Sequence, residues 1–446
     1  MFICIQRDKD NKNRIVSYTL QDMDGHTQVI SAADLLEAMK TGEIIVNLRL
    51  TSNNKIVLKD SKDTVCKTVV YNRKSVILNK TLVKILNFEG GLSFKSNANI
   101  ENDLLKAKLL GYKIRQLNTN LFVFSNNMER KLVSSDVIEI RHAQGLFNNT
   151  RFTSIDFHGV DTSKVTDMSE MFWGCTELEK INFSDFDTSK VQDMHKIFKG
   201  CNKLKDIDLT QFNTSNVIDM SQMFSACMEL EIIDLSKFDT SKVQYMFSMF
   251  KHCEKLKGID LTHFDTSNVT DMSQMFLGCY GLEKLDLNKF DTSKVQHMEE
   301  MFYCCKKLKE LELTNFDTSN VTDMGQMFLG CCELETIDIR SFDTSEVERM
   351  EGMFEFCEKM ETIDLSNFDT SKVQLMNDMF RSCTNLRCLS LINFDTSNVV
   401  DMSRMFCNCQ RLETLHIGDF DMSKVNTMEN MFFECNMIKA KITLSV

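Results

Sequence analysis

A unit of 26 residues recurs without insertion over the C-terminal part of the chain. Eleven copies align on an Asp-Thr-Ser turn, whose first residues are Asp161, Asp187, Asn213, Asp239, Asp265, Asp291, Asp317, Asp343, Asp369, Asp395 and Asp421. A fixed period of roughly 20–29 residues is typical of leucine-rich repeats, in which each unit buries its apolar face against its neighbours. The repeat therefore predicts a stack of like units instead of one compact core.

The copy that begins at Leu204 shows the expected parts of one unit. Leu204, Ile207 and Leu209 alternate like the inward side chains of a short strand, and the polar Asn-Thr-Ser that follows favours a turn. Asp219 stands three residues before Gln222, as in the capping box of a helix. The apolar residues of that stretch have helical spacing: Val217, Met220, Met223, Phe224 and Cys227. Each copy is therefore predicted to form a strand, a turn and a helix.

These parts predict a right-handed α/β solenoid of eleven leucine-rich-repeat-like units over 146–446, preceded by a small α+β N-terminal domain over 1–145. Residues 146–160 read as a degenerate first copy, and the register is lost after Cys435, as in a C-terminal cap. Equivalent apolar residues should form core ladders, with phenylalanines from Phe172 to Phe432 and methionines from Met168 to Met428.

The N-terminal domain shares none of this periodicity. We expect two lobes in it, divided near residues 90–100. Helices are predicted at 31–42 and 101–111, each ending on a glycine. Strands are predicted at 2–6, 14–21, 44–50, 121–125 and 136–140.

The copies alternate in pairs. The residue after the turn serine reads Lys190, Asn216, Lys242, Asn268, Lys294, Asn320, Glu346, Lys372, Asn398 and Lys424. This alternation slips once, at Glu346. The residue after the first leucine of each copy also alternates in charge, as in Glu179 and Lys205, and it slips in the same region, between Glu335 and Glu361. A shared phase error indicates that the duplicated unit has 52 residues, with one unpaired copy near 346. Alternation also avoids like charges on neighbouring rungs, where they would repel.

Eleven cysteines recur at one position: Cys175, Cys201, Cys227, Cys253, Cys279, Cys305, Cys331, Cys357, Cys383, Cys409 and Cys435. Their place at the end of the apolar stripe favours buried, reduced thiols over disulfides or a metal array. The extra cysteines Cys304, Cys332, Cys388 and Cys407 form no C-x-x-C pair, so we predict no zinc site. No catalytic or nucleotide-binding motif occurs, and we expect no enzyme activity, no cofactor and no metal.

One row of side chains should point outward from the strands, between the two inward residues. Its members are Asp208, Asp234, Asp260, Asp286, Glu312, Asp338 and Asp364. Stacked carboxylates repel one another, so the row is either a solvated polar face or a binding surface for a basic protein, a basic peptide or a cation. The Asp161-type row, by contrast, is expected to cap turns.

The net charge of −12 combines a basic head with an acidic body. Residues 1–149 carry 22 Lys and Arg against 15 Asp and Glu. Eight of these basic residues are Lys55, Lys59, Lys62, Lys67, Arg73, Lys74, Lys80 and Lys84. Such a patch suits nucleic acid, and it equally suits the acidic repeats of the same or another molecule.

The unit LxxIDLSxFDTSxVTDMSxMFxGC resembles the 26-residue repeat of BspA-like bacterial surface proteins, a branch of the leucine-rich repeats. The resemblance covers roughly residues 150–438 and implies a cell-surface or secreted protein that acts in adhesion. The N-terminus, however, lacks the basic stretch and apolar run of a signal peptide. No apolar run approaches the roughly 18 residues of a membrane helix. The residues themselves therefore favour a cytoplasmic protein without membrane insertion.

We expect a non-enzymatic scaffold for protein–protein recognition, which binds a basic protein partner through the acidic strand face of the solenoid. Two alternatives stand beside it. One is a secreted or cell-surface adhesin of the BspA-like type, and the other is an enzymatic or nucleic-acid-binding activity in the N-terminal head.

Overall fold

The computed structural model describes residues 3–9, 15–21, 27–31, 48–50, 55–59, 65–70, 75–97, 100–118, 121–418, 420–435 and 441–444. Contacts within the chain divide it into two units. Unit 1 comprises Met1–Val76 and Phe94–Ile138, and unit 2 comprises Ile77–Ser93 and Glu139–Val446. The sequence predicts a boundary at 145, with all earlier residues in the head. The structure instead groups Ile77–Ser93 with the repeats.

The first part of unit 1 holds two antiparallel three-stranded sheets. They are β1 (Ile3–Lys9), β2 (Ile15–Gln21) and β3 (Thr27–Ser31), and β4 (Leu48–Leu50), β5 (Lys55–Lys59) and β6 (Val65–Val70). The strands predicted at 2–6 and 14–21 are confirmed, and the one at 44–50 is described only from Leu48. Of the helix predicted at 31–42, Ser31 ends β3 and the remainder lies outside the described residues.

The second part of unit 1 packs one helix on an antiparallel meander. The elements are α3 (Ile100–Leu109), β9 (Lys113–Asn118), β10 (Leu121–Ser125) and β11 (Glu129–Ser134). Ile100 and Ala107 of the helix pack in one buried cluster with Phe122, Phe124 and Val133. Gly111, at φ 77°, takes the left-handed conformation that ends a helix, and Tyr112 N–H bonds back to the Ala107 carbonyl. The helix predicted over 101–111 and the strand at 121–125 are confirmed.

Near its start, unit 2 has a strand that pairs with the first repeat although its sequence does not match the repeat pattern. Asn79 caps α2 (Lys80–Leu86) by accepting the Leu82 N–H at 3.0 Å. The residues Gly90–Ser93 of β8 (Gly90–Ser96) then pair parallel with β13 (Phe152–Asp156), which pairs parallel with β15 (Lys180–Asn182). A further sheet has the order β14 (Val160–Asp161), β12 (Val137–Ile140), β7 (Ser75–Leu78). The strand predicted at 136–140 is thereby confirmed.

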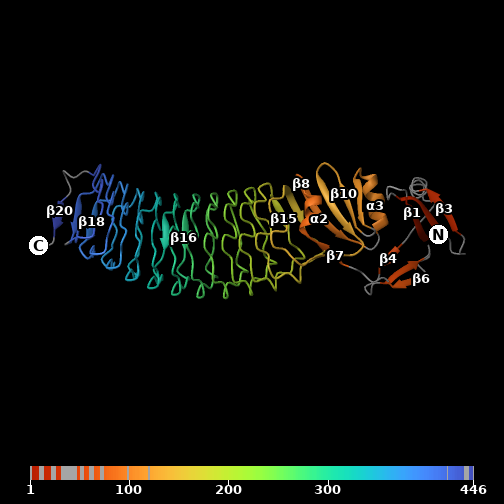
Figure 1. Ribbon diagram of the computed structural model, residues 1–446, viewed down its shortest axis with the longest axis horizontal. Coiled ribbons are helices and arrows are strands. Elements are labelled where there is room, and N and C mark those ends of the chain that lie inside the picture. Colours follow the sequence, from red (N-terminus) through yellow and green to blue (C-terminus); the bar gives the residue numbers. More distant parts are fainter. Residues whose placement is uncertain are drawn as a thin grey trace. The chain divides into compact units, whose positions relative to one another are not determined.

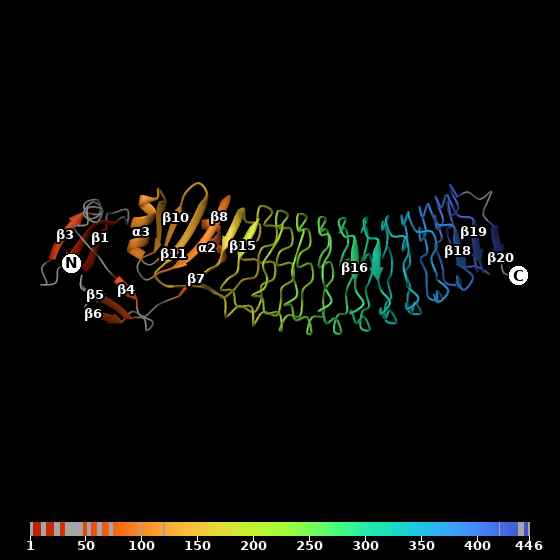
Figure 2. The ribbon, with the colours of Figure 1, turned by 180° about the vertical axis from the view of Figure 1, so that it is seen from behind.

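The repeats form a solenoid-like stack in which each copy is one turn (Figures 1 and 2). Neighbouring copies pair in parallel through single bridges, which run from Asp167↔Asp193 to Asp401↔Thr427. Short parallel strands add to this pairing in two places. They are β16 (Lys284–Asp286) with β17 (Glu310–Glu312), and β18 (Cys388–Leu391) with β19 (Thr414–Ile417) and β20 (Lys441–Leu444).

The helix predicted in each copy is wrong. From Gln144 to Cys435 the described residues form no α-helix. Gln222 and Ala226 have φ of 54° and 59°, and the equivalent residues of the other copies are left-handed too, whereas a helix needs φ near −63°. The backbone N–H groups of Gln222 and Phe224 donate to Phe247 and Met249 of the next copy instead of to residues of their own turn. Asp219 accepts the Ser221 N–H at 2.8 Å, so the capping box is wrong as well.

The core of the stack consists of ladders of identical residues. The rings of Phe172 and Phe198 lie parallel with centroids 5.6 Å apart, and the stacking continues rung by rung to Phe432. The methionines of the predicted ladder are fully buried from Met168 to Met402, whereas Met428 in the last copy is exposed. The predicted apolar ladders are therefore confirmed, except at the end of the stack.

Threonines join neighbouring copies by a buried polar ladder. The Thr214 hydroxyl accepts the Asp239 N–H at 2.8 Å and donates to the Asp239 carbonyl at 2.9 Å. Thr214 is 1% exposed, and its equivalents from Thr162 to Thr396 are buried to the same degree. The threonine of the Asp-Thr-Ser turn therefore faces inward and fixes the spacing of the turns.

Candidate acidic recognition surface

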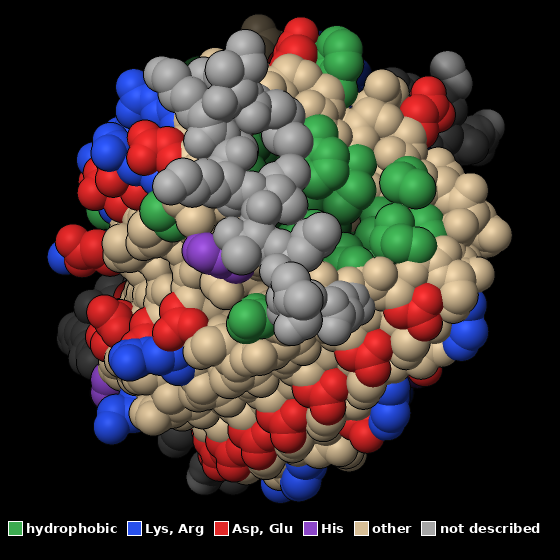
Figure 3. Space-filling model, turned by 90° about the vertical axis from the view of Figure 1, so that its left-hand side faces the viewer, with side chains coloured by type: hydrophobic (Ala, Val, Ile, Leu, Met, Phe, Trp, Pro, Cys, Tyr) green, Lys and Arg blue, Asp and Glu red, His purple; other side chains and the backbone are tan. Residues whose placement is uncertain are grey.

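The predicted acidic row lies along one side of the stack, one side chain per copy. Six of its seven carboxylates are exposed, and Asp338 is half-buried. The two residues that flank Asp208, Ile207 and Leu209, are 8% and 1% exposed, as the alternation along a strand requires. Figure 3, which views the unit from the end that carries the C-terminus, shows acidic side chains following one another in rows along the stack.

The carboxylates of the row also hold the chain's local conformation. Each aspartate accepts the backbone N–H two residues later, from Thr210 for Asp208 at 3.0 Å to Ser366 for Asp364 at 3.1 Å. Asn182 occupies the same position in an earlier copy and accepts the Ser184 N–H at 3.0 Å. The sequence analysis missed this role of the row, because an aspartate's bond to a nearby N–H is not visible in a strand pattern.

Hydrogen bonds favour the ionised form of several carboxyls in the row. Bonds from the Thr210 hydroxyl and N–H lower the pKa of Asp208, although the neighbouring Asp234 carboxylate opposes the shift. The pKa of Asp260 is lowered in the same way by Thr262. The Arg340 guanidinium, 2.8 Å from Asp338 Oδ2, lowers the pKa of that carboxyl to about 2. These three carboxyls therefore stay negatively charged well below neutral pH.

A second acidic row runs beside the first, formed by the turn aspartates. Asp239 Oδ1 accepts the Ser241 N–H at 3.0 Å, and Asn213 makes the equivalent bond to Ser215 at 3.1 Å. The predicted capping role of these residues is confirmed. Most of them are exposed as well, so each turn carries two acidic positions.

The ladder cysteines from Cys175 to Cys409 are fully buried free thiols, which confirms them as core residues. Each thiol donates to a phenylalanine carbonyl of the preceding copy, as Cys227 does to Phe198 at 3.3 Å. Burial raises the pKa of Cys227 and Cys279 to about 12. Cys435, in the last copy, is half-buried.

The basic patch of the head is described only in part. Lys80 and Lys84 lie exposed on α2 in unit 2. Lys55, Lys59 and Lys67 lie on β5 and β6, and their side chains are outside the described part of the chain. The positions of Lys62, Arg73 and Lys74 are outside it as well.

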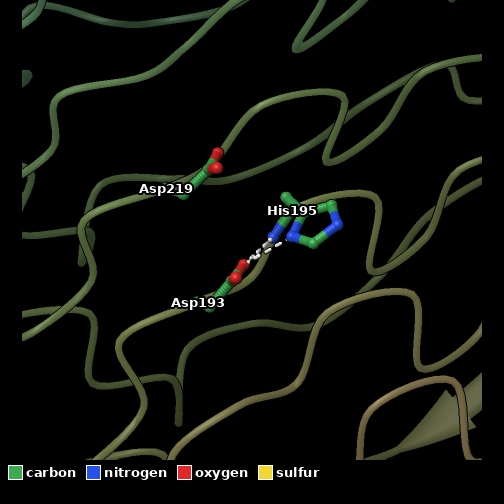
Figure 4. Close-up of side chains that lie close together, drawn as sticks. All are labelled: Asp193, His195 and Asp219. Carbon is green, nitrogen blue, oxygen red and sulfur yellow. Dashed lines mark hydrogen bonds and ion pairs between the residues drawn. The ribbon is translucent and has the colours of Figure 1, made fainter.

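One cluster of ionisable side chains was not predicted. His195 Nδ1 lies 2.8 Å from Asp193 Oδ1, and the ligand-type atoms of Asp193, His195 and Asp219 all lie within 4.8 Å of one another (Figure 4). The signal in the sequence was a histidine at the position where Ser169, Ser221 and Ser273 stand in other copies.

The stacked turns, identical core ladders and inter-copy hydrogen bonds define a repeat protein whose sides are rows of equivalent residues. A family model described as Mycoplasma protein of unknown function, DUF285, matches residues 115–231, 141–257, 218–335, 305–388 and 357–444. These matches span more than half of the chain, and the chain belongs to this family.

Other comparisons add little. No curated protein matches the chain. A solved structure titled "Crystal structure of TLR13-ssRNA13 complex" matches with 14% sequence identity and a TM-score of 0.23. That match covers 81% of this chain and 59% of the solved chain, so this chain spans less than two thirds of its length. None of the described helices has the length and apolar character needed to span a membrane.

Proposed function

We propose that this chain is a non-enzymatic recognition scaffold that binds a basic protein segment along the acidic row. The observation that carries the proposal is the row itself: seven carboxylates, from Asp208 to Asp364, project from consecutive turns in one orientation. Hydrogen bonds fix six of them before any partner arrives, so little side-chain entropy is lost on binding.

The electrostatics of the row favour a cationic partner. Paired strands place equivalent residues roughly 4.7–4.9 Å apart, where like charges repel. Asp286 and Glu312, for example, are direct partners of the β16–β17 pair. Among the described residues, the one ion pair of the row joins Asp338 to Arg340. Lysines or arginines from a partner would relieve this repulsion along the whole row.

The test is a pull-down from native lysate with the full chain and with a variant that carries Asp234→Asn, Asp260→Asn, Asp286→Asn and Asp338→Asn. Because Asn182 already makes the same backbone bond, these changes remove charge and keep the turn. We expect the variant to lose a basic partner that the parent retains, with affinity at least tenfold weaker. Binding by the parent should also weaken between about 50 and 300 mM salt.

The matched control changes the second row by the same charge: Asp239→Asn, Asp265→Asn, Asp291→Asn and Asp317→Asn. Asn213 shows that asparagine forms this turn too. Recovery of the same partner by the control and not by the first variant supports the proposal. Equal recovery by all three proteins, or by none, contradicts it.

A further inference from the structure

The cluster around His195 differs from every other copy at the same place. In two other copies the residue two positions after the bridging aspartate is a serine whose hydroxyl bonds that carboxylate: Ser169 bonds Asp167 and Ser273 bonds Asp271, both at 2.6 Å. His195 makes this bond with Nδ1, at 2.8 Å from Asp193 Oδ1. The turn forms even with glycine at this position, where the Gly325 N–H bonds Asp323 at 2.8 Å, so the imidazole adds a nitrogen ligand that the fold does not require.

Two carboxylates and one imidazole converge there from consecutive turns. Asp193 and Asp219 are bridge partners in the parallel ladder, which fixes their carboxylates on adjacent rungs. Their oxygen atoms and the His195 nitrogen all lie within 4.8 Å of one another. Two ligands bound at roughly 2.0–2.2 Å to one tetrahedral ion lie about 3.3–3.6 Å apart, so small side-chain movements bring the three into coordination distance.

The surroundings suit a partly exposed cation. The side chains of His195 and Asp193 are 25% and 37% exposed, so solvent ions reach them. Glu170 Oε1, on the preceding turn, lies 3.8 Å from His195 Nε2, so the second ring nitrogen also faces a carboxylate. Carboxylates behind a ligating histidine commonly orient the ring and strengthen it as a ligand. Lys196 Nζ, 3.2 Å from Glu170, offsets part of that negative charge.

We propose that Asp193, His195 and Asp219 form a binding site for a divalent transition-metal ion, with zinc as the ion to test. Imidazole with two carboxylates suits zinc and its neighbours better than calcium or magnesium, which prefer oxygen ligands alone. Water completes the coordination. The site has no part in the acidic recognition row, and neither proposal depends on the other.

The test is calorimetric titration of zinc into the reduced, chelator-treated full chain, compared with His195→Ser and Asp219→Asn. His195→Ser restores the residue found in other copies, so the metal-free melting temperature should stay within a few degrees of the parent. We expect one zinc site in the parent and at least tenfold weaker binding at that site in both variants. Magnesium should not compete at a similar concentration.

Cobalt provides a second readout, because its absorption distinguishes ligand types. Bound cobalt should show d–d bands without the intense thiolate charge-transfer band that cysteine ligands produce. Equal zinc affinity and stoichiometry in the parent and His195→Ser would overturn the proposal. The absence of a zinc site in the parent, or a thiolate band that persists in both variants, would overturn it as well.

Discussion

Glu355 is a buried carboxyl within a small network of charges on neighbouring turns. It is 8% exposed and bonds Arg381 at 3.0 Å, while Asp378 bonds Arg404 at 2.7 and 2.8 Å. Burial raises the pKa of Glu355 to about 7, the Asp378 charge adds to the shift, and the two arginines oppose it. The arginine charges thus satisfy Asp378 more fully than Glu355. At neutral pH, Glu355 is partly ionised, and its buried charge lowers the stability of the folded chain.

The sign of the resulting pH dependence follows from the direction of the shift. The folded pKa lies above the unfolded one, so the stabilising contribution of protonated Glu355 is complete below about pH 4.5 and is lost as pH rises through 7. Glu355→Gln stays neutral at every pH. We expect the free energy of unfolding of the variant, relative to the parent, to rise by about 2–3 kcal/mol between pH 5 and pH 8.

Urea unfolding at pH 5, 6.5 and 8 measures this difference. Glu358→Gln, an exposed change in the same copy, is the control and should show parallel curves for variant and parent. A Glu355→Gln variant whose stability also runs parallel to the parent would show that Glu355 titrates normally in the folded chain.

At the scale of the element, the alternation of lysine and asparagine is a hydrogen-bond ladder. Asn268 Nδ2 donates to the Ser241 carbonyl at 2.8 Å, and its Oδ1 accepts from Lys294 Nζ at 2.7 Å. Asparagine thus links the copies on both sides. Two successive lysines would lack the side-chain acceptor, and two successive asparagines would lack the longer lysine donor. At the phase slip, Lys372 pairs with Glu346 at 2.6 Å instead. The alternation with a 52-residue period, which the sequence analysis attributes to duplication, therefore also has a role in linking the copies.

This ladder predicts an order of stability for substitutions of Asn268. Asn268→Lys removes both bonds and places three lysines on successive rungs, so we expect a loss of about 1–2 kcal/mol. Asn268→Glu keeps an acceptor for Lys294, as Glu346 does for Lys372, and should lose about 0.5–1 kcal/mol less. Denaturant midpoints of the three proteins at low salt measure the order. Equal losses in both variants would mean that Lys294 gains nothing from its acceptor.

The turns also show where sequence reasoning succeeds and where it stops. Apolar residues spaced like Met220, Met223 and Phe224 face one side both in a helix and in successive tight turns, so the pattern identified the core and not the backbone. Left-handed residues decide between the two, and glycine signals them only in some copies, as at Gly200 and Gly278 but not at Ala226. Similarly, strand alternation predicted the exposed acidic row, but the bond from its carboxylates to the chain required the fold.

The rung formed by Gly90–Ser93 shows a different limit. Its sequence does not match the repeat unit. It joins the stack by pairing in parallel with β13, more than 50 residues later in the chain. Periodicity predicts how copies contact each other, because both partners carry the same pattern. It cannot predict what covers the first copy, since that partner has an unrelated sequence.

At the scale of the whole stack, stability is shared between neighbours. Each interior phenylalanine of the Phe172–Phe432 ladder stacks on its equivalent in the copies on either side, and the methionines and cysteines beside it are buried, so an interior turn opens only if two interfaces break. A copy at the end of the stack has one such interface. Consistent with this, Met428 and Cys435 of the last copy are more exposed than Met272 and Cys279 in the middle.

Thiol reactivity reports this gradient directly. Burial raises the pKa of Cys279 and Cys383 to about 12, so at neutral pH their reactive thiolate is scarce even without the steric barrier. Cys388, by contrast, is exposed. In the native chain we expect Cys388 to react with a thiol reagent about 10³-fold faster than Cys279, because Cys279 is buried and its thiolate is scarce. Cys409, beside the last copy, should react between the two.

Peptide mass spectrometry after timed labelling gives each rate separately, and full labelling in denaturant shows that every thiol was reduced. Labelling of the interior cysteines should be faster in a low concentration of denaturant than in its absence, because these thiols become accessible only through local unfolding. If Cys279 and Cys388 react at similar rates in the native chain, the ladder is not a closed core. If Cys279 and Cys409 are equally protected, the stack opens as one unit and not from its end.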